Sequence, residues 1–580
     1  MTRVDYTIIA IYLVSLLIFG VFLAKRASQS SEHYFLGDRK LPWWALGASG
    51  MSSNLDIAGT MTLVTMLYWF GLHGFFIEMR GGVVLPIAIF MAFMGKWHRR
   101  SQVMTTAEWM QLRFGKDWQG KLARMSAAVT YLVITIGMVV FFLGAAGKFL
   151  SVFLPFTILQ CQLLMLAIAF LYTVLSGIYG VVWTDVVQSV LIGGAALYVA
   201  IVGFSEVTPE LLEQWPGATF NRVLPSLFQE ELKINTSHGI LDYRFFGLCL
   251  LVWASKGILE GLGGSGGSAY MAQRFYSAKN ESDCLKIGML WTILFAFRWP
   301  MVLGFAVLAI SLGVGTKDPE VILPEVLLSE FFPSGVRGII IAAMLAAAMS
   351  TFDSTINAGA SYVVKDLYQP LKQSCTEKEL VWVGYIASFF IVVTGLFITL
   401  NFDSIVGIWV AIVTNLFPAF LVPFALRWFW ERFNGAGFTM GILTGFTASL
   451  LTFIFVSDEY LHEIHTVLIV ASCSLLGSVL GTFMTPQTEE KIRKEFYNTT
   501  KPQGLWNKDW KQSDREEHRN NLQTMVVSLM WQISTFLIPM TIMLKMVAET
   551  LCLSILWCTA STYLWYQLKA NDAKKVEQDP

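Results

Sequence analysis

Runs of apolar residues about 20 long recur along nearly the whole chain. A helix of that length crosses the hydrocarbon core of a bilayer. Lipid leaves helices as the only option for such segments, because every backbone polar group must be satisfied internally. The pattern predicts an all-α polytopic membrane protein with about fifteen transmembrane helices, near 5–24, 43–69, 74–96, 122–149, 157–178, 181–204, 244–262, 284–313, 337–363, 380–400, 403–430, 436–456, 463–484, 523–543 and 546–567.

Charged loops give the expected orientation. The loops after the first, third, seventh, ninth and eleventh spans carry Lys and Arg, as at Arg99 and Arg100, whereas the opposite loops are acid-rich, as at Glu230 and Glu231. Basic loops stay on the cytoplasmic side. We therefore expect the N-terminus outside and the C-terminus in the cytoplasm, with the protein in the plasma (cell inner) membrane. The segment 5–24 is too long for a signal-peptide core and lacks a small-residue cleavage site, so we interpret it as a retained span.

Composition excludes several function classes. The 580 residues are 55% hydrophobic and 14% charged, and a net charge of zero with dispersed basic residues argues against nucleic-acid binding. The seven cysteines show no CxxC or Cys/His spacing, so neither a disulfide framework nor a zinc site is expected. The longest inner loop, 486–522, reads as a solvated connector. With no Ser/His, Cys/His or metal-ligand constellation, the sequence predicts no enzyme.

Polar residues inside three predicted spans indicate a functional site. Asp185 lies in one span and the run Ser350-Thr351-Phe352-Asp353-Ser354 in another. Ionisable groups within a membrane are costly and usually face a cavity or an ion path. A third span, from Gly47 to Thr60, is too polar for a lipid-facing helix and carries Asn54 and Asp56 at its middle. Small residues there allow close packing, but a broken helix that frees backbone carbonyls for sodium fits the mid-span polar residues better.

Several motifs, in order, resemble the sodium:solute symporter family, which includes sodium-coupled sugar, proline and sialic acid transporters. The resemblance covers roughly residues 5–485, and its strongest elements are Leu41-Pro42-Trp43-Trp44, Val182-Trp183-Thr184-Asp185, Ala272-Gln273-Arg274 with Ala278-Lys279, and Ala348-Met349-Ser350-Thr351 followed by Lys365-Asp366-Leu367-Tyr368. It implies a LeuT-like core of two inverted five-helix repeats with additional peripheral helices. The chain then divides into a first peripheral span with its inner loop (1–42), a first repeat (43–204), an extracellular loop (205–242), a second repeat (243–432), two further spans (433–485), a cytoplasmic connector (486–522) and two last spans with a short cytoplasmic tail (523–580).

The resemblance also implies a principal sodium site. Matched position by position, its ligands are the carbonyls of Ser52, Leu55 and Ala347 and the hydroxyls of Ser350 and Thr351. Five protein oxygens suit a hard cation. The alternative is that the two hydroxyls bond back to the preceding helical turn.

A second cation site is implied at Asp185, Ser350, Asp353 and Ser354. Positions 350, 353 and 354 share one helix face, and Asp353 stands where some family members have a serine. Two nearby carboxylates would raise one pKa unless a cation lies between them. The sequence leaves open a tighter second cation site, a protonated Asp353 with partly proton-dependent coupling, or a plain hydrogen bond between helices.

Substrate contacts are carried over less completely. Asn54 and Glu78 match sugar-contacting positions, whereas Gly59 and Val410 replace polar glutamines and the glycine run 261–267 replaces an aromatic gate. These departures argue against a hexose. The candidate substrate-binding residues share a place in or beside the broken helix, the next span or the glycine run: Asn54, Asp56, Gly59, Glu78, Arg80, Gly81, Gly261 and Gly264.

Several predicted spans also contain charged residues, which are unusual inside a membrane. Lys256 and Glu260 are four apart and could pair on one helix face, unless both snorkel to a span end. Glu78 and Arg80 are two apart and are expected to need other partners, with Asp56 a candidate for Arg80. These ions either brace the bundle or bind a small charged or zwitterionic solute, in which case Arg80 or Arg298 would take a carboxylate.

We therefore expect a sodium-coupled secondary transporter that takes up a small polar, charged or zwitterionic organic solute by alternating access. Sodium would be co-transported, and the partners would be the solute, sodium and the lipid bilayer. The alternatives are a sugar or monocarboxylate symporter, a transporter-like membrane sensor, or a channel. A sensor would need an output domain, and the tail after residue 567 is short and charged.

Overall fold

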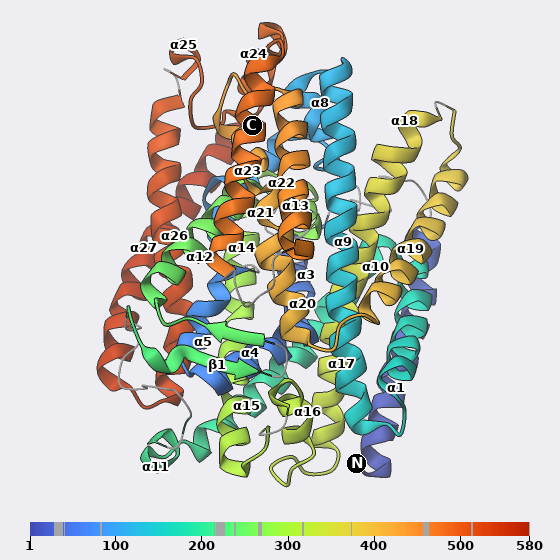
Figure 1. The fold of residues 1–580 in the computed structure, drawn as a ribbon, viewed down its shortest axis with the longest axis vertical. Helices are drawn as coiled ribbons and strands as arrows, with labels where there is room; N and C mark the ends of the chain where they lie inside the picture. The colour runs from blue at the N-terminus through green and yellow to red at the C-terminus, as the bar shows by residue number, and fades with distance from the viewer. Residues whose placement is uncertain are drawn as a thin grey trace.

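The computed structural model describes residues 1–27, 39, 41–81, 84–213, 215, 227–236, 239–264, 269–315, 318–372, 374–455, 463–511 and 514–578. Most helices run along one long axis, with α1 (Arg3–Ala27) starting at the lower end in Figure 1. The lower end also carries α11 (Pro209–Glu213) and α16 (Ile322–Leu327), and the upper end carries α8 (Trp109–Phe114), α24 (Glu490–Thr500) and α25 (Lys508–Lys511). Short helices therefore lie at both ends of the bundle.

The first half of the core opens with a broken helix. α3 (Trp43–Asn54) and α4 (Ile57–Phe70) replace the continuous span predicted at 43–69. The span predicted at 74–96 is divided into α5 (His73–Ile77), the 3-10 turn η2 (Glu78–Arg80), α6 (Pro86–Ile89), the π-helical turn η3 (Phe90–Met94) and α7 (Gly95–Ser101). α9 (Trp118–Phe153) follows, and both spans predicted at 157–178 and 181–204 lie within α10 (Ile158–Glu206).

The second half of the core is also interrupted. Its helices are α12 (Phe246–Leu262), α13 (Ala269–Tyr276), α14 (Glu281–Phe295), α15 (Arg298–Leu312), α17 (Val336–Tyr362), α18 (Gln369–Leu371), α19 (Glu377–Thr399), α20 (Ile405–Ala411) and α21 (Pro418–Phe429), with π-helical turns η6 (Val363–Tyr368) and η7 (Ile412–Leu416). In the apolar stretch of the span that contains α17, 94% of the residues are buried, against 11% in the apolar stretch of α27 (Val547–Gln578). α17 is therefore the centre of the bundle and α27 its periphery.

Peripheral helices cover the core. α22 (Gly435–Phe455) packs along α23 (Glu463–Met484), and α26 (Arg515–Met543) packs along α27. Trp531 and Leu564 of the last pair form a small apolar cluster with Met91 and Leu285 of the core. The connector predicted at 486–522 contains α24 and α25, as a partly helical segment.

The all-α expectation needs one addition and one adjustment. An antiparallel hairpin, β1 (Lys233–Thr236) with β2 (Gly239–Asp242), lies in the predicted outer loop beside the 3-10 turn η4 (Glu230–Leu232). By length and composition, nine helices among the described residues can cross a membrane, or ten if the bent pair of α20–η7 and α21 is one span. The predicted count of about fifteen is not confirmed, because broken spans such as α3, α4 and α12 are individually too short for that test.

Candidate functional site

The helix break predicted from the polar residues lies in the core. α3 ends at Asn54, and Asp56 begins α4 by accepting a hydrogen bond from the Gly59 amide. Asp56 stabilises this break because a carboxylate satisfies the free amides of a helix start. α14 and α15 are joined by a turn at residues 296–297 whose backbone stays helical, and together they form one span, Glu281–Leu312, in place of the span predicted at 284–313.

The predicted principal sodium site lies where α3 packs against α17. The Ser52 hydroxyl is buried and has no hydrogen-bond partner in the described structure. Thr351 Oγ1 donates to the Ala347 carbonyl at 3.1 Å, and Ser350 Oγ donates to Asp185. In this conformation the back-bonding alternative therefore holds for Thr351 but not for Ser350. Leu55, which follows the end of α3, leaves the helical region with φ −92° and ψ 64°.

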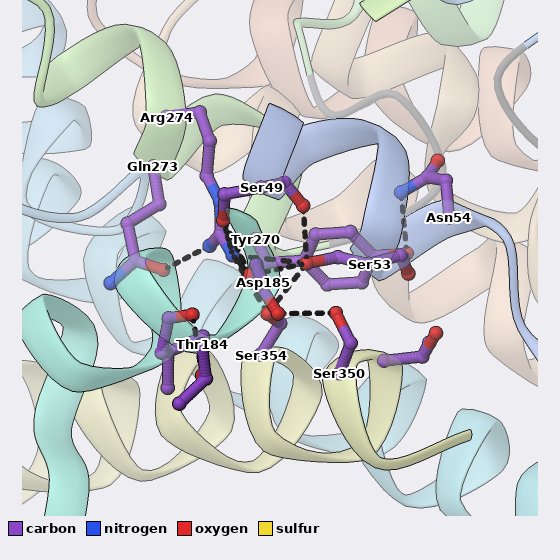
Figure 2. Close-up of polar contacts among 12 residues, drawn as sticks. Ser49, Ser53, Asn54, Thr184, Asp185, Tyr270, Gln273, Arg274, Ser350 and Ser354 are labelled. Atoms are coloured by element: carbon purple, nitrogen blue, oxygen red, sulfur yellow. Dashed lines mark hydrogen bonds and ion pairs between the residues drawn. The ribbon is translucent and has the colours of Figure 1, made fainter. Parts of the chain in front are cut away.

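Asp185 is the centre of a polar cluster between α3, α10 and α17 (Figure 2). Its carboxylate accepts hydrogen bonds from Ser49 at 2.5 Å, from Ser53 at 3.4 Å and from Ser350. The side chain is fully buried. Three hydroxyls and a carboxylate provide the kind of oxygen set that a cation site needs.

Arg274 from α13 supplies a cation to the same cluster. Its Nη2 lies 3.6 Å from the Asp185 carboxylate and donates to Ser49, Ser53 and Ser354 at 3.0, 3.1 and 2.7 Å. The sequence prediction placed Asp185, Ser350 and Ser354 together, and the structure brings these three close. It did not include Arg274, although that residue stands in a quoted motif, nor the serine pair of α3, whose spacing of four on a polar span was an available signal.

Asp353 and Asp185 share a neighbour on α1. The charges of both carboxylates act on the Tyr12 hydroxyl. Tyr12 accepts a hydrogen bond from Gln188 Nε2 at 2.9 Å. The four-residue cation set of Asp185, Ser350, Asp353 and Ser354 stays a prediction.

A second charged network surrounds Arg80. Its Nη1 donates to Tyr243 at 2.8 Å and to both Glu463 oxygens at 3.1 and 2.9 Å, and its Nη2 donates to Glu78 at 3.1 Å. Trp409 Nε1 donates to the other Glu78 oxygen at 3.0 Å. The expectation that Glu78 and Arg80 need separate partners is wrong, because the tight 3-10 turn η2 lets the two side chains meet. No sequence pattern indicated Glu463, which lies 383 positions away from Arg80.

Lys256 and Glu260 of α12 pair as expected. Their charged groups are 3.5 Å apart and Lys256 also donates to the Arg80 carbonyl. Both residues are buried, at 3% and 0% exposure, which contradicts the alternative that they snorkel to a span end. Lys256 also lies 4.9 Å from the Phe417 ring. These ions therefore brace η2, α12 and η7.

Asp56 has a different counter-ion from the one expected. The opposite charge that acts on it comes from Arg298, and Arg80 makes its contacts elsewhere. Arg298 Nη1 donates to the Asn54 carbonyl at 3.2 Å. Gly59 lies against the same guanidinium, since a Cβ there would be only 2.6 Å from Arg298 Nη2. The expected pair of Asp56 with Arg80 is therefore wrong, because α15 begins beside the helix break.

The other predicted substrate contacts are packed against protein. Asn54 Nδ2 donates to the Tyr270 hydroxyl at 2.8 Å. A Cβ on Gly81 would meet Trp409 at 2.7 Å, and one on Gly261 would meet Ile89 at 2.5 Å. Gly264 has φ +70° and ends α12 against His98. Of the glycine run 261–267, residues 265–267 lie outside the described residues.

A buried carboxylate ties the lower end of the bundle together. Glu320 of the 3-10 turn η5 (Pro319–Val321) contacts Lys148 at 2.6 Å and accepts from Ser404 Oγ and the amides of Ile405 and Val406. Burial alone would raise the pKa of this carboxyl, but the Lys148 ammonium and these hydrogen bonds outweigh it and hold the pKa below its ordinary 4.5. The contact joins α9, η5 and the start of α20.

Comparisons with known proteins agree with this architecture. The model of the sodium:solute symporter family matches residues 34–445. The chain is 26% identical over 495 residues to sodium/glucose cotransporter 4 of Danio rerio, covering 78% of this chain and 71% of that protein. It is 24% identical over 438 residues to the sodium/sialic acid symporter NanT of Aliivibrio fischeri, covering 71% and 82%.

A solved structure shows the same fold. The substrate-bound, outward-open state of a Na⁺-coupled sialic acid symporter superposes with a TM-score of 0.63 at 19% identity, covering 84% of this chain and 99% of that one. The chain has the LeuT-like transporter fold, and its relatives are sodium-coupled transporters rather than enzymes. This protein belongs to the sodium:solute symporter family and is a sodium-coupled secondary transporter.

Proposed function

We propose that the protein carries a small charged or zwitterionic organic solute into the cell, together with sodium, by alternating access. The observation that carries this proposal is the helix break at Asp56 with Arg298 beside it. These two residues provide two opposite charges in the core that the bracing network around Arg80 does not use. A broken helix that presents free backbone groups at mid-membrane is the usual site of solute and ion in such transporters.

Sodium in this proposal binds between α3 and α17. Its ligands are the carbonyls of Ser52, Leu55 and Ala347 and the hydroxyls of Ser350 and Thr351. The unpartnered Ser52 hydroxyl supports this assignment as evidence of a polar pocket at the break. Thr351 would turn its hydroxyl from the Ala347 carbonyl to the ion, which frees that carbonyl as well. The ion would thereby join the broken helix to the central helix.

The membrane potential supplies part of the driving force. One positive charge that moves inward across 100 mV gains about 2.3 kcal/mol. The plasma membrane, with the N-terminus outside and the C-terminus inside, is part of the proposal and rests on the basic loops. The lower end in Figure 1 then faces outward.

We infer that one sodium suffices in the conformation seen here. A second cation at Asp185, Ser350, Asp353 and Ser354 would compete with Arg274, whose guanidinium already donates to the cluster. A second sodium would therefore require Arg274 to move away. Protonation of Asp353 is the competing candidate, because a proton would remove the repulsion between two buried carboxylates.

Sodium-dependent stability of the purified protein tests the principal site. Sodium that binds the folded form raises its stability by about 2.7 kcal/mol at 100 times its dissociation constant. We expect sodium chloride, but not potassium chloride, to raise the melting temperature of the wild type, and Thr351→Ala to lose most of that rise. Ser361→Ala is the matched control, because Ser361 lies on the same helix and bonds back to Ala358.

The outcomes of this test are distinct. An equal response to sodium and potassium would contradict the sodium site, and a full sodium response in Thr351→Ala would contradict its ligand set. Uptake of labelled solute into proteoliposomes against its gradient then separates a transporter from a membrane sensor. Binding without sodium-driven accumulation would favour the sensor.

A further inference from the structure

Arg298 is a buried guanidinium with an unused edge. It is 6% exposed, and its one hydrogen bond runs from Nη1 to the Asn54 carbonyl at 3.2 Å. Nε and Nη2 are both buried and have no hydrogen-bond partner in the described structure. Buried polar groups are nearly always paired, and a charged donor left unpaired is costly. The unused edge therefore calls for a ligand.

The two free nitrogens lie on the same edge of the guanidinium. Nε–H and one Nη2–H point in parallel, and this edge takes a carboxylate through two hydrogen bonds. We propose that Arg298 binds the carboxylate of the transported solute through its Nε–Nη2 edge, and that the solute is a zwitterion whose cationic end lies toward Asp56. This rests on the proposed function and names the substrate class of its central site.

The position of Arg298 supports an anion there. It lies in the middle of the span Glu281–Leu312, where a buried cation with unpaired donors is costly and an anion would relieve that cost. Phe295, whose ring lies 5.3 Å from the guanidinium carbon, holds the side chain from one side.

Asp56 explains why a zwitterion is favoured over a simple anion. Its carboxylate accepts from the Gly59 amide and does not form an ion pair with Arg298 in the described chain. It nevertheless gives the strongest opposite charge near Arg298. A solute with only a carboxylate would be repelled by Asp56, whereas a positive group at its other end would be attracted. The positive Arg298 would therefore face the carboxylate of a zwitterion, and the negative Asp56 would face its positive group.

Gly59 makes this arrangement possible. A Cβ there would be 2.6 Å from Arg298 Nη2 and 3.2 Å from the Asp56 carboxylate oxygens. Gly59 is also partly exposed although it lies in the core, and Asp56 is 9% exposed. The break is therefore accessible on the Asp56 side, while the free edge of Arg298 is covered in this conformation and has to be uncovered for the solute to reach it.

Thermal-shift measurements on the full-length protein in sodium chloride test the proposal. The probes are three zwitterions (glycine, L-proline and glycine betaine), three carboxylates (acetate, lactate and pyruvate) and three uncharged polyols (glucose, mannose and myo-inositol). We expect at least one zwitterion to raise the melting temperature by ~1 °C or more. Carboxylates should act more weakly, and polyols not at all.

Variants assign the effect to the edge of Arg298. Arg298→Gln should abolish the zwitterion response, and Arg298→Lys should weaken binding about ten-fold or more, since an ammonium cannot bind bidentately. A role limited to bracing the helix break would lower the melting temperature without changing this response. The response to sodium alone reports that each variant is folded.

Each outcome decides one part of the proposal. A polyol response equal to that of the zwitterions, a response that survives in Arg298→Gln, or no response to any of the six carboxylate-bearing probes would overturn the carboxylate site. A stronger response to carboxylates than to zwitterions would overturn the role of Asp56. If sodium alone does not raise the melting temperature of the wild type, the proposed sodium site is wrong instead.

Discussion

Two buried arginines in the same transporter core have opposite surroundings. Among the described residues, Arg80 makes four hydrogen bonds, to Tyr243, Glu78 and Glu463, and Arg298 makes one, to a backbone carbonyl. Both are at most 6% exposed. Burial of a charge therefore does not identify a binding site by itself. The partners decide, because a paired charge braces the bundle and an unpaired one calls for a ligand.

The difference also assigns the two roles that the sequence left open for the buried ions. Bracing fits η2, where Arg80, Glu78, Lys256 and Glu260 contact one another or the backbone. Solute binding fits the helix break at Asp56 and the neighbouring Arg298, because the bracing network around Arg80 does not use these two charges. The two roles can be separated by substitution.

The largest expected effect is on stability, at Arg80. Arg80→Ala leaves Glu78 and Glu463 without their cation, and removal of one partner from a buried pair costs about 3–5 kcal/mol. We expect a large fall in melting temperature and in the yield of folded protein. Arg298→Met is the matched variant at the other guanidinium. A smaller loss in Arg80→Ala than in Arg298→Met would invert the comparison.

The next effect is on transport, at Arg298. Arg298→Met removes a buried charge that has a single hydrogen bond among the described residues but also takes the opposite charge from Asp56, so we expect a stability loss of about 1–2 kcal/mol, smaller than that of Arg80→Ala. Sodium-driven uptake of a zwitterion into proteoliposomes should nevertheless fall at least about ten-fold. Unchanged uptake would show that Arg298 does not touch the solute.

A smaller effect is expected at Gly59. Gly59→Ala places a methyl group against Arg298 Nη2, so the guanidinium must shift. We expect solute affinity to fall roughly ten-fold, about 1.4 kcal/mol, while the sodium response stays. Gly194→Ala is the control, because a Cβ there meets nothing within 4 Å. Equal affinities in the two variants would mean that the space beside Gly59 is not used.

The smallest effect concerns pH and lies outside the core. Because the pKa of Glu320 lies below its ordinary 4.5, this carboxylate stabilises the fold above that pH, and the contribution is lost as pH falls through the folded pKa. We expect the melting temperature of the wild type to fall more steeply than that of Glu320→Gln between about pH 5 and pH 3. Parallel curves would contradict the role of Glu320.

The sequence was sufficient for the family, the fold and the helix break. Their signals are local: apolar runs of bilayer length, motifs in order, and polar residues in the middle of the span at 47–60. It was not sufficient for the partners of the buried charges. Arg80 pairs with Glu463, and the two meet only because α23 packs on the core.

Local geometry explains the remaining differences. α-Helical spacing puts Glu78 and Arg80 on different faces, but the 3-10 turn brings them together. Arg298 lies near Asp56 because α15 packs against α4. Arg274 was visible in a motif, but its position among the serines of α3 depends on how α13 packs.

The most direct test of the account is the coupling between the two sites. Binding of the zwitterion that gives the largest thermal shift is measured by calorimetry on the full-length protein, once in sodium chloride and once in potassium chloride. Coupling free energies are typically 1–3 kcal/mol, so we predict about 5–150-fold tighter binding in sodium, with the difference lost in Thr351→Ala. Equal affinity in the two salts would contradict a sodium ion that joins the break at Asp56 to α17.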